Sequence, residues 1–149
     1  MNILEYENYY EDKNHVDMVF PYNTYLCSIP LDFSEVPLHW HEEIEIIYVK
    51  KGKGCITVDF RQYVVKAPTI VLIIPGQLHC IEQMDECSME YENILFHPNI
   101  LLPKRNDSSS TDFLLPLLTA GELVGVRLRN PQICHIFRTA QGHRLTPSS

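Results

Sequence analysis

Three histidines and one glutamate at close spacing offer the clearest chemistry in this sequence. His39, His41 and Glu45 stand within one segment rich in β-branched residues. Residues an even number of positions apart project from the same face of a strand, so two imidazoles and a carboxylate are predicted to converge. His79, after a tight turn at 75–78, completes a set of three nitrogens and one oxygen. Such a set suits Fe, Mn, Ni, Cu or Zn.

The same residues admit a second interpretation, in which no metal is required. Clustered histidines also hydrogen-bond to each other, to water or to an organic ligand, so a polar pocket is predicted under either interpretation. Asn93 and His97 share one face of a predicted strand and are secondary candidates for lining this pocket. The predicted effector-binding residues are therefore His39, His41, Glu45, His79, His97 and Asn93, of which the first four are the candidate metal ligands. A catalytic residue is not assigned.

Two neighbouring side chains are assigned to packing instead. Trp40 lies between two of the histidines and points, by strand alternation, to the opposite face. Cys80 directly follows His79, so thiol and imidazole are predicted to face opposite sides and not to form a nucleophile and base pair. The sequence has no Ser/His/Asp order, phosphate loop or nucleophile elbow.

Short runs of β-branched and aromatic residues must position these groups. Strands are predicted over residues 24–29, 39–49, 55–60, 63–66, 70–74 and 89–97, joined by turns at 50–54, 61–62 and 75–76. Residues 44–49 are apolar on both faces, which predicts that a helix or a second copy of the chain covers the outside. Many short strands at this spacing are typical of a β-sandwich or barrel.

The composition limits the function classes. The chain has 149 residues with 45% hydrophobic content, enough for one domain with a core. A net charge of -7 provides no basic stripe, so this chain alone is not expected to bind nucleic acid. The five cysteines have no CxxC spacing and no signal peptide is evident, which predicts a cytoplasmic protein. The longest apolar run, 70–75, is too short to cross a membrane.

The C-terminal third differs in character. Residues 103–111 read as a polar linker, and Thr111 or Asp112 is expected to cap a short helix through 113–121, which Pro116 weakens. The leucines of this helix would pack on the barrel or on a second copy. Beyond residue 128 the pattern predicts a poorly ordered tail. The predicted division is a β domain at 1–102 and a linker, short helix and tail at 103–149.

The spacing also carries a family resemblance. His39, His41, Glu45 and Gly52 match the first motif of the cupin superfamily, whereas the second motif is matched only in part, by Gly76 and His79. Residues 20–102, with HWHEEIEIIYVKKGKG, IPGQLH and FHP, more specifically resemble the N-terminal domain of AraC-family regulators. The sequence departs from that family at 61–62 and 67–69.

The resemblance implies a mainly β, cupin or jelly-roll-like barrel with a short C-terminal helical segment. It further implies a bacterial sensor that binds a sugar or another small metabolite, forms a homodimer and needs no cofactor. A helix-turn-helix domain would follow, and the unpatterned end of this chain predicts a truncation or frameshift near 126–130. The alternative is a small metal-dependent cupin enzyme of the dioxygenase, isomerase or decarboxylase type.

Overall fold

The computed structural model describes residues 1–13, 22–101 and 126–128. The elements in chain order are α1 (Ile3–Glu7), β1 (Tyr22–Ile29), β2 (Glu35–His39), β3 (Ile44–Val58), β4 (Arg61–Lys66), β5 (Thr69–Ile73), β6 (His79–Gln83), β7 (Met89–Phe96), the 3-10 turn η1 (Pro98–Leu101) and β8 (Val126–Leu128). The described part of the chain is thus mainly β, as the sequence predicts. None of its helices is long and apolar enough to span a bilayer.

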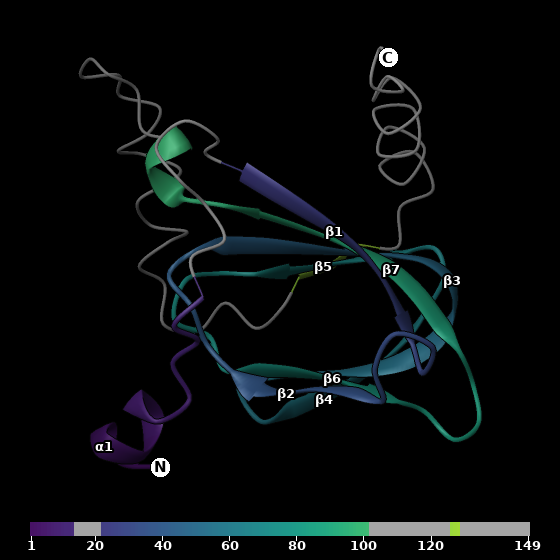
Figure 1. Ribbon diagram of the computed structural model, residues 1–149, viewed down its shortest axis with the longest axis horizontal. Coiled ribbons are helices and arrows are strands. Elements are labelled where there is room, and N and C mark those ends of the chain that lie inside the picture. Colours follow the sequence, from purple (N-terminus) through teal and green to yellow (C-terminus); the bar gives the residue numbers. More distant parts are fainter. Residues whose placement is uncertain (14–21, 102–125, 129–149) are drawn as a thin grey trace.

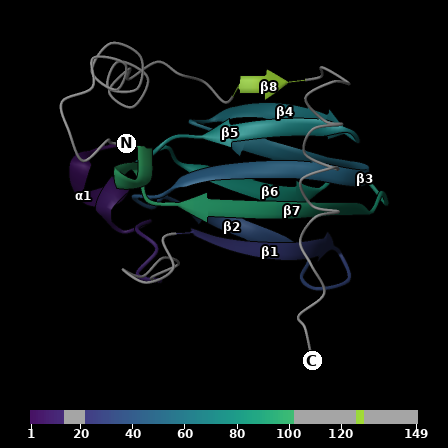
Figure 2. The ribbon, with the colours of Figure 1, turned by 90° about the horizontal axis from the view of Figure 1, so that it is seen from above.

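The strands form two layers that share one long strand. One layer has the order β1-β7-β3-β5-β8, and in the other β6 lies between β2 and β3, with β4 on the other side of β3. All of these pairings are antiparallel. Figure 1 shows the layers one above the other, with β3 curling around one end to join them, and Figure 2 shows the strands from above.

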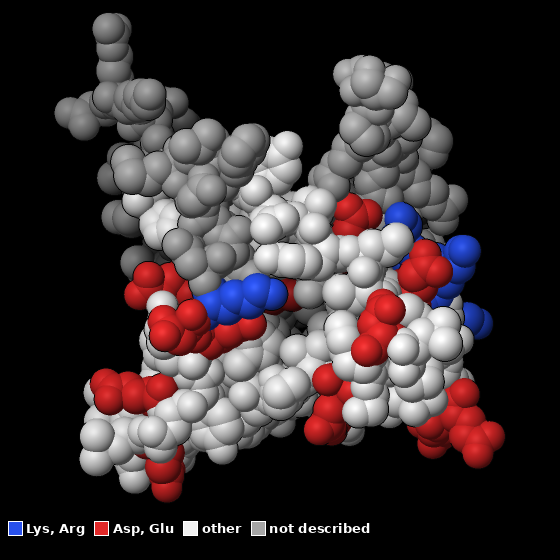
Figure 3. Space-filling model, viewed as in Figure 1, with Lys and Arg blue, Asp and Glu red and all other residues white. Residues whose placement is uncertain are grey.

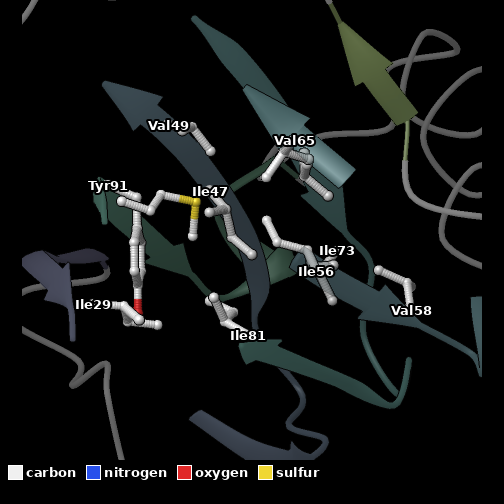
Figure 4. Close-up of a cluster of buried hydrophobic side chains, with 11 residues drawn as sticks. Ile29, Ile47, Val49, Ile56, Val58, Val65, Ile73, Ile81 and Tyr91 are labelled. Carbon is white, nitrogen blue, oxygen red and sulfur yellow. The ribbon is translucent and has the colours of Figure 1, made fainter. Parts of the chain in front are cut away.

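The hydrophobic core fills the space between the layers (Figure 4). It takes alternate residues from the facing sides of the strands, because successive side chains on a strand point to opposite faces. Its members are Ile29, Ile47, Val49, Ile56, Val58, Val65, Val71, Ile73, Ile81, Met89 and Tyr91. Ile44 and Tyr48, on the outward face of β3, are also buried. Both faces of this strand are therefore covered, as its apolar pattern predicts.

The prediction of two strands separated by a turn at 50–54 is wrong. The chain forms one strand, β3, which bends there: residues 44–52 pair with β7, and residues 53–58 pair with β4. Gly52 has φ of +77°, and the register against β7 shifts between Val49 and Lys51. Glycine at this position therefore serves a bulge that redirects a continuous strand, not a hairpin turn.

The predicted strand 39–49 is not one strand either: His39 ends β2, and β3 begins at Ile44. β2 pairs with β6 in one layer and β3 begins in the other, so the chain must cross between layers at 40–43. The strand β6 and the helix α1 were also not predicted. The strand β6 has only five residues, and α1 begins with a capping box in which Asn2 and Glu5 exchange hydrogen bonds.

The C-terminal predictions concern other parts of the chain. The helix at 113–121, its Thr111 or Asp112 cap and the tail beyond 128 lie outside the described residues. Strand β8, which pairs with β5 through Ile70 and Leu128, was not predicted.

Replacing Gly52 with alanine tests the bend in β3. A Cβ at this position would lie 1.9 Å from the Ser88 carbonyl oxygen, and the left-handed backbone disfavours side chains. We expect Gly52→Ala to lower the free energy of unfolding by about 3 kcal/mol or more, measured by urea denaturation. The control Lys51→Ala, at a neighbouring exposed position, should cost less than about 1 kcal/mol. Equal midpoints for the two variants would contradict this account of the bend.

Candidate functional site

The structure brings His39, His41, Glu45 and His79 together. His39 ends β2, His41 lies in the crossing segment, Glu45 is near the start of β3, and His79 begins β6. One ligand atom from each lies within 4.8 Å of all the others. The group therefore draws on both layers of the fold rather than on one strand, and the crossing at 40–43 allows His39 and His41 to face the same point.

Backbone carbonyls orient all three imidazoles. The Nδ1 atoms of His39, His41 and His79 lie 2.8, 3.1 and 2.8 Å from the carbonyl oxygens of Pro37, Glu43 and Gln77. A carbonyl only accepts, so each Nδ1 must donate an N–H. This leaves each Nε2 available to bind a proton, a ligand or a metal.

Glu45 is the charge around which the histidines gather. Its Oε2 lies 2.9 Å from Nε2 of His41 and 2.8 Å from Nε2 of His79, and only 3% of the residue is exposed. Burial by itself raises the pKa of Glu45. The charge of His79 and the hydrogen bonds from both histidines outweigh burial and hold that pKa far below its usual range.

The histidines themselves differ in protonation. Burial lowers the pKa of His41, but its hydrogen bond to Glu45 and the nearby carboxylates outweigh burial, so the net shift is upward. Burial, followed by the charge of His79, lowers the pKa of His39. The site thus contains one imidazole that favours the cation and one that favours the neutral form.

A cavity of about 400 Å³ opens beside this group. Its size is in the range of small-molecule sites. The lining residues are Glu11, Lys13, Tyr25, Cys27, Phe33, Glu35, Val36, Pro37, His39, His41, Glu45, Tyr91, Asn93 and Leu95. His79 is fully buried and does not line the cavity.

Two polar atoms in the cavity wall are buried without a hydrogen-bond partner. These are the hydroxyl of Tyr91 and Oδ1 of Asn93, on the inward face of β7. Burial raises the pKa of Tyr91, and the Cys27 thiol across the β1–β7 pair adds to this shift. Buried polar groups are nearly always satisfied in native proteins, so both atoms call for a partner from outside the chain.

The N-terminal segment supplies part of the rim. The indole of Trp40 stacks on Tyr6 with centroids 4.6 Å apart and donates to the Tyr6 carbonyl oxygen at 2.8 Å. The Glu11 amide donates to the Trp40 carbonyl, and a Glu11 carboxylate oxygen lies 3.8 Å from Nε2 of His39. Trp40 therefore packs away from the cavity, as strand alternation predicts, and holds the segment that brings Glu11 and Lys13 to it.

Of the two secondary candidates for the pocket, only Asn93 lies at the cavity. Asn93 lines the cavity, whereas His97 does not and instead accepts a hydrogen bond at Nδ1 from the Asn99 amide. Strand β7 ends at Phe96, so His97 leaves the alternation that would point it inward. The sequence reasoning missed Tyr91, although it lies two residues from Asn93 on the same face. Glu11 and Lys13 carried no signal, because only tertiary contacts bring them to the cavity.

The opposite pKa shifts predict a defined pH dependence of stability. The depressed pKa of Glu45 stabilises the fold above its unfolded-state value of about 4.3, and this contribution falls as pH drops. The raised pKa of His41 stabilises the fold below about pH 6.5, and this contribution falls as pH rises. Both are present between roughly pH 4.3 and 6.5.

We therefore expect the wild type to exceed Glu45→Gln in unfolding free energy most in that window, and by less on either side. Urea denaturation across pH 3 to 9 with a chelator present measures the difference. His39 is present in both proteins and largely cancels. A difference that does not vary with pH would contradict the assigned shifts.

Comparison with solved structures finds similarity to a cupin protein and to a predicted oxalate decarboxylase. A cupin protein from Bacteroides fragilis is 21% identical over 62% of this chain and 75% of that chain, with a TM-score of 0.49. A predicted oxalate decarboxylase from Thermotoga maritima is 23% identical over 50% of this chain and 64% of that chain, with a TM-score of 0.45. This chain thus covers less than two thirds of the second protein. No curated protein matches the sequence.

The family comparison is more specific. The AraC-like ligand binding domain matches residues 32–142, which is more than half of the chain and includes β2 to β8. The match contains all four clustered residues and the β7 wall of the cavity. The strands confirm the mainly β fold predicted from the sequence, and the chain belongs to the family of AraC-like ligand-binding domains.

Proposed function

We propose that the cavity binds a small-molecule effector and that this chain is the sensing domain of an AraC-type transcription regulator. The observation that carries the proposal is the pair of unpartnered polar atoms, the Tyr91 hydroxyl and Asn93 Oδ1, in the wall of the 400 Å³ cavity. Leaving such atoms unsatisfied costs about 1–3 kcal/mol each, so the fold keeps them at a cost that a ligand would remove.

The lining favours a ligand rich in hydroxyl groups, such as a sugar or a related metabolite. Asn93 Oδ1 needs a donor, the Tyr91 hydroxyl can donate or accept, and a hydroxyl group serves both. The apolar side chains of Phe33, Val36 and Leu95 would cover the carbon face of such a ligand. Glu35 and Lys13 at the same cavity add charged hydrogen-bonding groups.

The effector would act by changing the contacts between this domain and other parts of the regulator. We propose a β domain at 1–102 that binds the ligand, and a region at 103–149 that takes part in pairing two copies. The net charge of -7 and the acidic side chains that predominate in Figure 3 disfavour direct DNA contact, so DNA would be bound through a separate helix-turn-helix domain. The proposed setting is the bacterial cytoplasm.

A metal-dependent enzyme is the second candidate, and the donor set favours it. Both nitrogens of His41, and both of His79, face oxygen acceptors. Each ring would need two protons to satisfy these contacts, which would place two imidazolium ions against one buried carboxylate. A divalent cation held by the Nε2 atoms and a Glu45 oxygen would replace the protons between these atoms, so that both rings could stay neutral. The residues therefore fit a transition metal.

In that case His39, His41, His79 and Glu45 would hold the metal, and the carbonyls of Pro37, Glu43 and Gln77 would orient the three rings. The metal would act as a Lewis acid that polarises an oxygen of the bound molecule. Tyr91 and Asn93 would position that molecule in the cavity. The sensor interpretation does not depend on the metal, since its polar wall stands on β7.

Metal analysis and ligand screening on the purified protein separate the two functions. We expect a panel of sugars and polyols to raise Tm in a thermal-shift assay, since a ligand at 100 times its Kd contributes about 2.7 kcal/mol. Stoichiometric Fe, Mn or Ni together with turnover would instead establish the enzyme. A metal-free protein that no member of the panel stabilises would contradict the sensor proposal.

Tyr91→Phe should separate ligand binding from stability. The change removes an unpartnered buried hydroxyl and leaves the ring in the core, so the free protein should be as stable as the wild type or about 1 kcal/mol more stable. The affinity for the stabilising ligand should fall about tenfold, because one hydrogen bond in the cavity is lost. Isothermal titration and urea denaturation measure the two effects.

Tyr63→Phe is the matched control, because Tyr63 packs against the core but does not line the cavity. It should leave ligand affinity unchanged. Destabilisation by Tyr91→Phe without loss of affinity would show that the hydroxyl has a structural partner instead.

A further inference from the structure

Asp59, in a neighbouring turn, forms hydrogen bonds with the segment that precedes His79. Its amide donates to the Leu78 carbonyl at 2.7 Å, and its carboxylate accepts from the Leu78 amide at 3.1 Å and from Gln77 Nε2 at 3.0 Å. The buried Gln77 side chain in turn accepts from the Ile74 amide at 3.0 Å. Three hydrogen bonds from one residue thus fix the end of the turn at 75–78.

The turn that carries Asp59 is conformationally unusual. Asp59 has φ of +46° and Phe60 has φ of +65°, in the left-handed region that non-glycine residues rarely enter. The turn connects β3 to β4 and keeps two consecutive non-glycine residues in this conformation. The bonds to residues 77 and 78 account for the persistence of this geometry.

One peptide unit links Asp59 to His79. The peptide that joins Gln77 to Leu78 presents its N–H to the Asp59 carboxylate and its C=O to Nδ1–H of His79, at 2.8 Å. A carboxylate on the N–H side polarises the peptide and makes its carbonyl oxygen a stronger acceptor. The stronger the bond at Nδ1–H, the more electron density Nε2 offers on the other side of the ring.

We propose that Asp59 is a positioning residue for His79. It acts through the 77–78 peptide, which fixes the orientation of the ring and makes Nε2 a stronger electron-pair donor toward the site. The connection runs from the Asp59 carboxylate through peptide 77–78 to the His79 ring. This inference rests on the proposed role of His79 in the site. Gln77 supports the connection by holding Asp59 Oδ2 and the Ile74 amide at the same time.

The test begins with the ring of His79 in the metal-free protein. Asp59→Asn is nearly isosteric: its amide oxygen still accepts from Leu78, but the charge is lost and its NH2 faces the NH2 of Gln77. Heteronuclear NMR on 15N-labelled protein reports the Nδ1–H proton of His79. We expect this signal to move upfield and its exchange with water to accelerate, because the bond to the Gln77 carbonyl weakens.

A rescue pair separates a charge effect from loss of the turn. In Asp59→Asn combined with Gln77→Glu, the amide donates to the new carboxylate, which also accepts from Ile74, so the turn regains its hydrogen bonds. The charge, however, no longer bonds to the Leu78 amide. We expect the pair to recover the unfolding midpoint but not the His79 signal. Recovery of both would overturn the proposal, since Asp59 would then only build the turn.

Phe60→Gly is the matched control. Phe60 lies in the same turn, is exposed and makes none of these bonds, so this variant should leave the His79 signal in place. A shift as large as that of Asp59→Asn would also overturn the proposal.

Binding of Co²⁺ gives a second readout. We expect Asp59→Asn and the rescue pair to bind Co²⁺ about tenfold more weakly than the wild type, and Phe60→Gly to bind it equally well. Failure of the wild type to bind Co²⁺ would count against the metal site, while the NMR signal would still decide the role of Asp59. An unchanged signal in Asp59→Asn would overturn that role whether or not the metal binds.

Discussion

A carboxylate buried to 3% exposure, at Glu45, is the constraint on which the site depends. An ionised group inside a β fold persists only when surrounding donors replace the water it has lost. His41 and His79 provide them from the crossing segment and from β6. Those two rings must then be held by acceptors on their far side, and the carbonyls of Glu43 and Gln77 meet that need. These successive hydrogen bonds, from carboxylate to imidazole to carbonyl, constrain the backbone at 40–43 and 75–78.

The two-layered architecture brings the carboxylate and its donors together within a small fold. The continuous strand β3 carries Glu45 in one layer and pairs with β6, which carries His79, in the other. Aliphatic side chains such as Ile47, Ile56 and Ile81 form the hydrophobic core between the same two layers. The low polarity that makes the histidine and carboxylate contacts strong also makes any unpaired polar atom costly. This explains why the unpartnered atoms on β7 are informative about a ligand.

The cavity and the cluster of Glu45 with its histidines are adjacent, but they require different chemical groups from a ligand. Near Glu45, the structure calls for positive charge between nitrogen and oxygen atoms, which protons or a cation can provide. Near Tyr91 and Asn93, it calls for a neutral hydrogen-bonding partner. The N-terminal segment adds Glu11 and Lys13 at the cavity, so a ligand there would contact residues as far apart in the sequence as Glu11 and Leu95.

The residue types and their spacing determined by themselves that the fold is mainly β, because β-branched runs are a local property. They also identified the histidines and the glutamate as one group, although the tertiary structure assembles that group from three strands and a crossing segment and not from one strand. They could not determine that β2 and β3 are separate or that β3 is continuous through Gly52, since these depend on which layer each strand joins. They gave no sign of Glu11, and none of Asp59 behind His79, because both reach the site through hydrogen bonds between residues distant in the chain. Pairing between layers, and not local pattern, decided which polar side chains meet and which atoms remain for a ligand.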